Sequence, residues 1–210
     1  LSNADDEKLI SLSAKDLATE TASESMAPGG GSIAAYVGAL GVSLGTMVAN
    51  LSANKAGWES KLDVFSNWAV KGQELKRELL FLVDEDTRSF NAIIGAIRMT
   101  KGTDEEKTAR KNAIELSSQY ASEVPYKVMQ TAMMARALLR AMLEIGNPAS
   151  VTDAGVGALC CLTAVEGAYM NVRINTKDLS DRTFANDLNA KAENLLKEAK
   201  QVFGSITTEV

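Results

Sequence analysis

Two neighbouring aspartates are the residues best suited by type and spacing to transfer protons. Asp84 and Asp86 lie within residues 80–90, where apolar side chains recur at helical spacing. Asp86 stands three residues after Val83 and four before Phe90, so it belongs to the stripe that should face inward. A carboxylate in that position loses contact with water, which raises its pKa toward the range of a general acid. We therefore expect an acid/base group here.

The absence of histidine narrows the possible chemistry. It excludes Ser-His and Cys-His nucleophile schemes and removes the commonest general base and metal ligand. Any proton transfer must then use Asp, Glu, Lys, Tyr or Cys. The two aspartates also have a simpler interpretation, an exposed acidic turn that pairs with Arg88 or Lys76. Residue chemistry alone leaves both interpretations open.

A proline and three glycines open a helix of very small residues. The segment Pro28-Gly29-Gly30-Gly31-Ser32 leaves backbone N–H groups at a helix N-terminus available to an anionic or polar ligand. A second Pro-marked turn, Gly146-Asn147-Pro148, opens another Gly/Ala-rich helix near Asp153. The two turns predict two halves of one site. The alternative is that both serve only sharp turns and close helix packing, and Ser150-x-x-Asp153 is itself a capping box.

Composition excludes several classes of protein. A net charge of −5 and only 5% aromatic residues disfavour nucleic-acid binding. The adjacent Cys160 and Cys161 cannot form an ordinary disulfide with each other or build a zinc site unaided. We expect them to be small buried side chains in a reducing cytoplasm, and we expect no metal site.

The elements that must position these groups are helices joined by short turns. Ser13 and Thr103 each begin a capping box, and Pro125 should bend the helix that contains it. The predicted helices are a first one that ends before Pro28, a glycine-rich one to about 53, 58–97 as one helix or a kinked pair, 103–145, 150–175 and 179–203.

These elements predict an all-α fold, an antiparallel bundle of long helices around a buried Gly/Ala-rich helix. No alternating Val, Ile or Thr run indicates a sheet. Residues 11–210 should form one domain, and residues 1–10 a disordered start that includes a cloning remnant, Ser2-Asn3-Ala4. No charge occurs between Met26 and Asn54, but the polar residues within this stretch favour a buried or interface helix over a membrane span. We expect no membrane contact and no signal peptide.

Five motifs occur in order along the chain: PGGGSIAA at 28–35, VDEDTRSF at 83–90, TDEEK at 103–107, SVTDAGV at 150–156 and GAYMNVRIN at 167–175. Together they resemble the cyclodeaminase domain of formiminotransferase-cyclodeaminase. They equally resemble its stand-alone bacterial relatives, which are cyclodeaminases or methenyltetrahydrofolate cyclohydrolases.

The resemblance implies an all-helical homodimeric folate enzyme that needs no metal or cofactor. In the cyclodeaminase reaction, N10 of 5-formiminotetrahydrofolate attacks the formimino carbon, ammonia leaves, and the 5,10-methenyl cation remains. The resemblance makes Asp86 the first choice for the acid/base and Asp84 the second. The glycine turn and Asp153 would frame the pterin, while Asn171 and Asn175 would supply amide hydrogen bonds.

Other features bear on substrate and partners. The family often has proline where this chain has Thr100, but Lys101 is kept. Without a formiminotransferase domain, either a separate transferase supplies the substrate, or the substrate is 5,10-methenyltetrahydrofolate and the protein is a cyclohydrolase. Basic residues around Lys101 could hold a polyglutamylated folate tail, or they could form a solvated face. These residues are Arg98, Lys101, Lys107, Arg110 and Lys111.

An alternative, non-enzymatic function for this protein is that of a helical scaffold or a folate-binding protein. It would assemble through small residues on two helices, namely Gly41, Gly45, Gly155 and Gly157.

Overall fold

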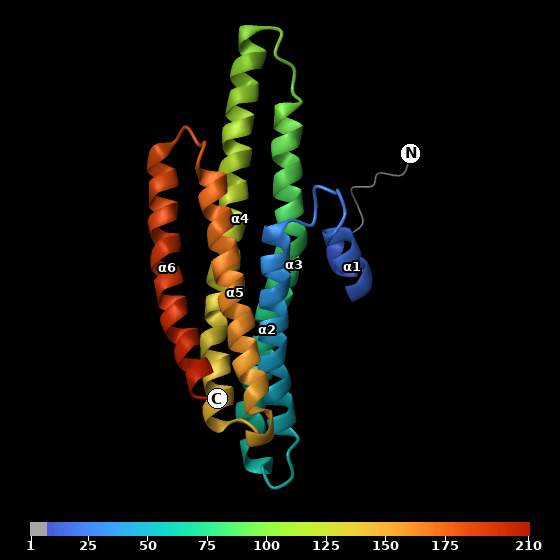
Figure 1. Ribbon diagram of the computed structural model, residues 1–210, viewed down its shortest axis with the longest axis vertical. Helices are drawn as coiled ribbons and strands as arrows, with labels where there is room; N and C mark the ends of the chain where they lie inside the picture. Colours follow the sequence, from blue (N-terminus) through green and yellow to red (C-terminus); the bar gives the residue numbers. More distant parts are fainter. Residues whose placement is uncertain (1–7) are drawn as a thin grey trace.

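The computed structural model describes residues 8–210 and shows an elongated bundle of antiparallel helices (Figure 1). The α-helices are α1 (Ala14–Thr21), α2 (Gly30–Ala53), α3 (Leu62–Ile97), α4 (Asp104–Ile145), α5 (Val151–Thr176) and α6 (Arg182–Thr208). Three short 3₁₀ helices accompany them: η1 (Leu9–Ser11), η2 (Glu59–Lys61) and η3 (Pro148–Ser150). No strand occurs among residues 8–210, so the predicted all-α bundle is confirmed. Residues 1–7, including the predicted remnant, lie outside the described part.

Of the three predicted capping boxes, the one at Thr103 forms in full and the one at Ser13 forms only as an N-cap. The Ser13 side chain accepts from the Asp16 N–H, and Thr103 and Glu106 cap each other reciprocally at the start of α4. The third prediction is wrong, because the Ser150 side chain makes no capping hydrogen bond at α5. Asn147 takes this role one turn earlier, where its side chain accepts from the Ala149 N–H and begins η3.

The two longest helices run without interruption. Of the two alternatives for residues 58–97, the structure has one helix, α3. α4 continues through Pro125, where sequence reasoning predicted a bend and a resumption. Figure 1 shows the end of α3 and the start of α4 projecting as a hairpin beyond the other helices.

The glycine-rich helix α2 buries most of its small residues but exposes Leu40, Met47 and Leu51, so the prediction of a buried helix holds only in part. It packs against α3, α4 and α5, and its small residues allow the backbones to approach closely. A Cβ on Gly41 would come 2.7 Å from the Gly157 carbonyl oxygen, and one on Gly157 would come 2.8 Å from that of Gly41. Gly45 packs against the Leu139 side chain, which lies 3.0 Å from where a Cβ would be. These glycines serve packing inside one chain, which removes the basis of the scaffold hypothesis.

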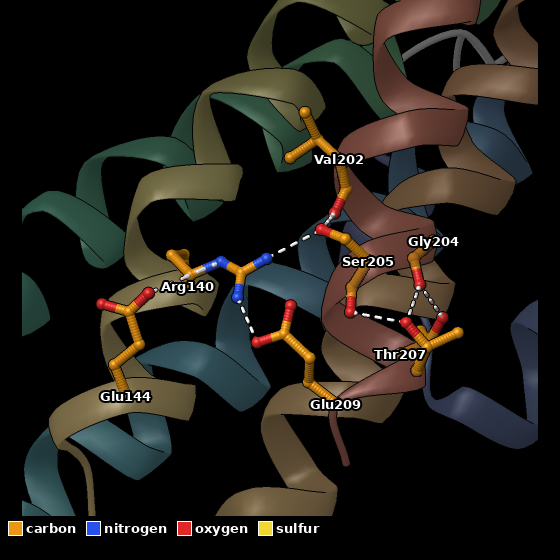
Figure 2. Close-up of polar contacts among 8 residues, drawn as sticks. Arg140, Glu144, Val202, Gly204, Ser205, Thr207 and Glu209 are labelled. Atoms are coloured by element: carbon orange, nitrogen blue, oxygen red, sulfur yellow. Dashed lines mark hydrogen bonds and ion pairs between the residues drawn. The ribbon is translucent and has the colours of Figure 1, made fainter.

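Arg140 fastens the end of the chain to α4 (Figure 2). Its guanidinium donates to Glu209 at 2.6 Å and to Ser205 at 2.7 Å, both on the last turns of α6 or directly after them. The following Val210 lies so close to Gly155 that a Cβ there would meet it at 2.9 Å. Gly155 therefore accommodates Val210. All four glycines that the scaffold hypothesis assigned to assembly thus pack against residues of their own chain.

Two helical segments, Gly30–Ala53 and Pro148–Thr176, are long and apolar enough to cross a membrane by length and composition. They are also helices that pack against each other within the bundle, and core helices commonly share this composition.

Candidate active site

The antiparallel pairing of α2 and α3 brings Asp86 to the N-terminus of α2. Gly29 is the N-cap, and its carbonyl accepts from the Ile33 N–H as the helix begins. The Ser32 hydroxyl donates to Asp86 Oδ2 at 2.7 Å, and the Ser32 backbone N–H also favours the ionised form of this carboxylate. Among residues 8–210, the N–H groups of Gly30 and Gly31 donate to no protein acceptor. Two donors therefore remain for a ligand beside the carboxylate.

The carboxylate of Asp86 lies directly against the Cα of Gly31. A Cβ at Gly31 would come 2.7 Å from Cγ and 2.8 Å from Oδ2 of Asp86, which is closer than real Cβ atoms come to other atoms. By contrast, a Cβ at Gly29 would meet nothing within 4 Å. Of these two glycines, only Gly31 is required by the approach of the aspartate.

Burial raises the pKa of Asp86 above its ordinary value, and the hydrogen bonds from the Ser32 hydroxyl and N–H oppose this shift. The predicted inward position and raised pKa are both confirmed. The alternative of an exposed acidic turn paired with Arg88 or Lys76 is wrong. Arg88 pairs with Glu85, and Lys76 forms no ion pair with either aspartate within residues 8–210. Asp86 therefore combines a desolvated carboxyl with donors that can stabilise its ionised form.

A small pocket of about 140 Å³ adjoins Asp86. It is enclosed by the turn before α2, by α3, by α4 and by the C-terminal half of α5. Its lining residues are Met26, Ala27, Gly29, Gly30, Gly31, Asp86, Thr87, Ser89, Phe90, Ile93, Ala121, Asn171 and Asn175. The structure thus brings together the glycine turn, the first-choice aspartate and both predicted amides.

The two asparagines are held in place by backbone carbonyls. Asn171 Nδ2 donates to the Gly167 carbonyl at 2.9 Å, and Asn175 Nδ2 donates to the Ala121 carbonyl at 2.7 Å. Ala121 lies four residues before Pro125, which has no N–H to complete the helical hydrogen bond. The proline therefore leaves the carbonyl free to orient Asn175.

Five predicted residues lie outside the pocket lining: Pro28, Ser32, Asp84, Lys101 and Asp153. Ser32 reaches the site only through its hydrogen bond to Asp86. Pro28 is buried just before the glycine turn, with a cis bond to Ala27. Asp84 is two residues from Asp86, which turns it to a different side of α3. Lys101 lies in the loop at the tip of the α3–α4 hairpin (Figure 1).

Asp153 lies far from the glycine turn within one chain. α2 and α5 are antiparallel, with Gly157 beside Gly41 and Gly146 beside Val48. The start of α5 is therefore about 20 Å along α2 from Gly31. The two Pro-marked turns do not meet in a single chain, and the prediction of two halves of one site finds no counterpart there.

Sequence reasoning missed several groups at or near the pocket. Thr87, Phe90 and Ile93 line it, and the spacing of Phe90 from Asp86, one helical turn, was a usable signal. Glu85 is buried and accepts from the Tyr120 hydroxyl, and burial together with this bond raises the pKa of Tyr120 to about 12. Nothing local in the sequence indicates that pairing, because the partners are on different helices.

No group of three or more Cys, Asp or Glu side chains that could hold a metal ion occurs in the described range 8–210. Cys160 and Cys161 are free thiols, and burial raises the pKa of both. Cys161 is fully buried in the core, as predicted, while Cys160 is partly buried.

Comparison with known proteins decides the family. The family model of formiminotransferase-cyclodeaminase matches residues 13–194. The chain belongs to this family. The formimidoyltransferase-cyclodeaminase of Rattus norvegicus is 33% identical over 195 residues, which make up 93% of this chain and 36% of that protein. The chain thus spans about a third of the length of this relative.

A second relative has nearly the same length. The methenyltetrahydrofolate cyclohydrolase of Methylorubrum extorquens is 35% identical over 178 residues, covering 85% of this chain and 86% of that protein. The crystal structure of formiminotetrahydrofolate cyclodeaminase from Thermotoga maritima superposes with a TM-score of 0.82 at 24% identity, covering 94% of this chain and 95% of that one. This likeness confirms the fold, and the predicted family is confirmed by the sequence matches.

Proposed function

We propose that this member of the formiminotransferase-cyclodeaminase family is a folate one-carbon enzyme, a 5-formiminotetrahydrofolate cyclodeaminase with Asp86 as its acid/base. The observation that carries the proposal is the partly buried Asp86 carboxyl against Gly31, with a raised pKa and open N–H donors beside it. Relatives named for this activity supply the substrate class.

In this proposal one carboxyl moves a single proton from one nitrogen to another. The formimino group enters in its protonated, cationic form, C=NH2⁺. Ionised Asp86 takes the N10 proton as N10 bonds to the formimino carbon, which becomes tetrahedral and carries a neutral NH2 group. Protonated Asp86 then gives that proton to the departing nitrogen, the carbon–nitrogen bond breaks, and ammonia leaves. The 5,10-methenyl cation remains and Asp86 is ionised again. A raised pKa makes the protonated form easier to reach than it is for an ordinary aspartate.

The groups around Asp86 would orient the substrate. The side-chain amides of Asn171 and Asn175 and the N–H groups of Gly30 and Gly31 offer donors and acceptors to the edge of the pterin. The reaction as written needs no resident metal or cofactor. A separate formiminotransferase would supply the substrate in the cytoplasm.

A second candidate is 5,10-methenyltetrahydrofolate cyclohydrolase, which the length-matched relative from Methylorubrum extorquens favours. Here Asp86 would take a proton from water as it adds to the methenyl carbon. It would then give that proton to N5 as the carbon–N5 bond breaks, and the hydroxyl proton would pass to solvent as the carbon–oxygen double bond of the 10-formyl group forms. The same carboxyl serves both reactions because both pass through a tetrahedral carbon.

Purified protein assayed separately with each folate distinguishes the candidates. Appearance of methenyl absorbance with release of one ammonia per turnover supports the cyclodeaminase, and loss of added methenyl absorbance supports the cyclohydrolase. If both signals stay at the uncatalysed rate, the proposal is contradicted.

We also propose that the protein is a homodimer. Several exposed apolar side chains on α2 and α5 do not belong to the packed core of residues 8–210. They are Leu40, Met47, Leu51, Val156 and Leu159. Apolar patches of this kind on a single molecule commonly mark an interface. Sedimentation at micromolar concentration should show a dimer, and a monomer would contradict the proposal.

A further inference from the structure

The enclosed pocket beside Asp86 is too small for a whole folate. At about 140 Å³ it has roughly half the volume of the smallest typical ligand sites, about 300 Å³. The part of a ligand that enters it is thus limited to the group nearest Asp86, and the remainder must lie across the rim.

An apolar stripe on α3 leads away from this pocket. Phe90 follows Asp86 by four residues, Ile93 follows by seven and Ile97 by eleven, which places all of them on one side of the helix. Phe90 and Ile93 line the pocket, and Ile97 lies exposed one turn further on. None of the three belongs to the packed hydrophobic core of the described residues.

Phe90 is the aromatic member of this stripe. Its side chain is 36% exposed, and its ring has no aromatic partner among residues 8–210. Met26, from the turn before α2, lines the same rim and is 68% exposed. An aromatic face and a flexible thioether at the mouth of a pocket are suited to a flat ring.

The stripe ends at the basic loop between α3 and α4. From Asp86 to Ile97 the helix rises about 16 Å. The loop and the first two turns of α4 carry five cations, Arg98, Lys101, Lys107, Arg110 and Lys111, against three anions, Asp104, Glu105 and Glu106. A ligand with a reacting end, a flat middle and an anionic end would match this order.

We infer that Phe90, with Ile93, binds the aminobenzoyl ring of the folate by stacking. The inference rests on the proposed function. The reacting carbon bridges N5 of the pterin and N10 of the aminobenzoyl group, so a carbon held at Asp86 has one ring on each side. The polar pocket of amides and N–H groups suits the pterin, and the apolar rim suits the second ring.

Calorimetry with two probes tests the assignment. The first probe is 5-formyltetrahydrofolate, a stable analogue with both rings, and the second is a tetrahydropterin without the aminobenzoyl group. Phe90→Ala should weaken binding of the first about tenfold and leave the second unchanged. Phe90→Tyr should bind as wild type does, and Phe90→Leu should fall between, because it keeps bulk but lacks a flat face.

Phe81 on the same helix provides the matched control. It is 51% exposed and lies outside the pocket, with the Arg88 guanidinium over its ring at 6.0 Å. Phe81→Ala should change neither affinity, and thermal unfolding should be similar for both alanine variants.

Two outcomes would overturn the stacking inference but leave the proposed function standing. One is that Phe90→Ala or Phe90→Leu binds the two-ring probe with wild-type affinity. The other is that Phe90→Ala loses equal affinity for both probes. If wild-type protein binds neither probe, the proposed function fails and the inference fails with it.

Discussion

Pro125 of α4 and Asn175 of α5 share one carbonyl group. Pro125 cannot donate to the Ala121 carbonyl, and Asn175 Nδ2 donates to it instead at 2.7 Å. A residue that is unfavourable inside a helix thereby fixes an amide that lines the pocket beside Asp86.

Pro125→Ala should therefore separate stability from function. Restoring the N–H completes the helix, so the free energy of unfolding should rise by about 1–3 kcal/mol. The new donor competes for the Ala121 carbonyl, so kcat/KM should fall about five- to tenfold. Chemical denaturation and steady-state assays measure the two effects.

Asn175→Ala is the control for this coupling. It should lose similar activity with no gain in stability, and the double variant should be no less active than Asn175→Ala alone. Strictly additive activity losses would mean that Pro125 and Asn175 act independently.

Gly31→Ala should remove most activity. The added methyl group cannot coexist with the Asp86 carboxylate in its present place, so the acid/base group must move. We expect kcat/KM to fall at least about 100-fold, the scale of general acid–base catalysis. Gly29→Ala is the matched control, because its Cβ enters open space, and it should retain activity within a few fold. Similar losses for both variants would show that the turn as a whole matters and not the Gly31–Asp86 contact.

Ser32→Ala should shift the pH dependence of the reaction. The Ser32 hydroxyl lowers the pKa of Asp86, so its removal should raise that pKa further. Because ionised Asp86 is the form that accepts the first proton, the acidic limb of the kcat/KM profile should move to higher pH. Ser43→Ala, whose hydroxyl donates only to the Ala39 carbonyl of its own helix, should leave the profile in place. An unmoved profile in Ser32→Ala would argue that Asp86 does not govern this limb.

The local predictions succeeded where a few neighbouring residues decide the outcome. Ser13 and Thr103 cap their helices through residues three positions away, and the inward position of Asp86 follows from its spacing to Val83 and Phe90. The match to known motifs then identified the family, which single motifs could not do.

The predictions that failed concern features that depend on packing between helices. Ser150 has the spacing of a cap, but Asn147 begins η3 first and takes the role. Asp153 and Gly30 both follow Pro-marked turns, yet the antiparallel pairing of α2 and α5 sends them to different levels of the bundle. The link from Pro125 to Asn175 was equally hidden, because it requires knowing that α4 and α5 lie side by side.

Lys101→Glu tests where an anionic folate tail lies. Lys101 is exposed at the hairpin tip, whereas Lys107 pairs with Asp104 at 2.7 Å and Arg110 donates to the Ile97 carbonyl. The variant should raise KM for a polyglutamylated folate far more than for the monoglutamate, and added salt should have the same effect in wild type. Lys15→Glu makes the same charge change on exposed α1 and should alter neither KM. An equal effect of Lys101→Glu on both substrates would exclude the hairpin tip from the binding site.

The most direct test of the account is the turnover of Asp86→Asn, followed through methenyl absorbance and ammonia release, with Asp84→Asn as its control. Asparagine keeps the shape of the side chain but cannot carry a proton between nitrogens, so Asp86→Asn should lose at least about 1,000-fold in kcat while binding 5-formyltetrahydrofolate within a few fold of wild type. Asp84 does not line the pocket, so its variant should remain active. Activity of Asp86→Asn within about tenfold of wild type would contradict the assignment of Asp86 as the acid/base.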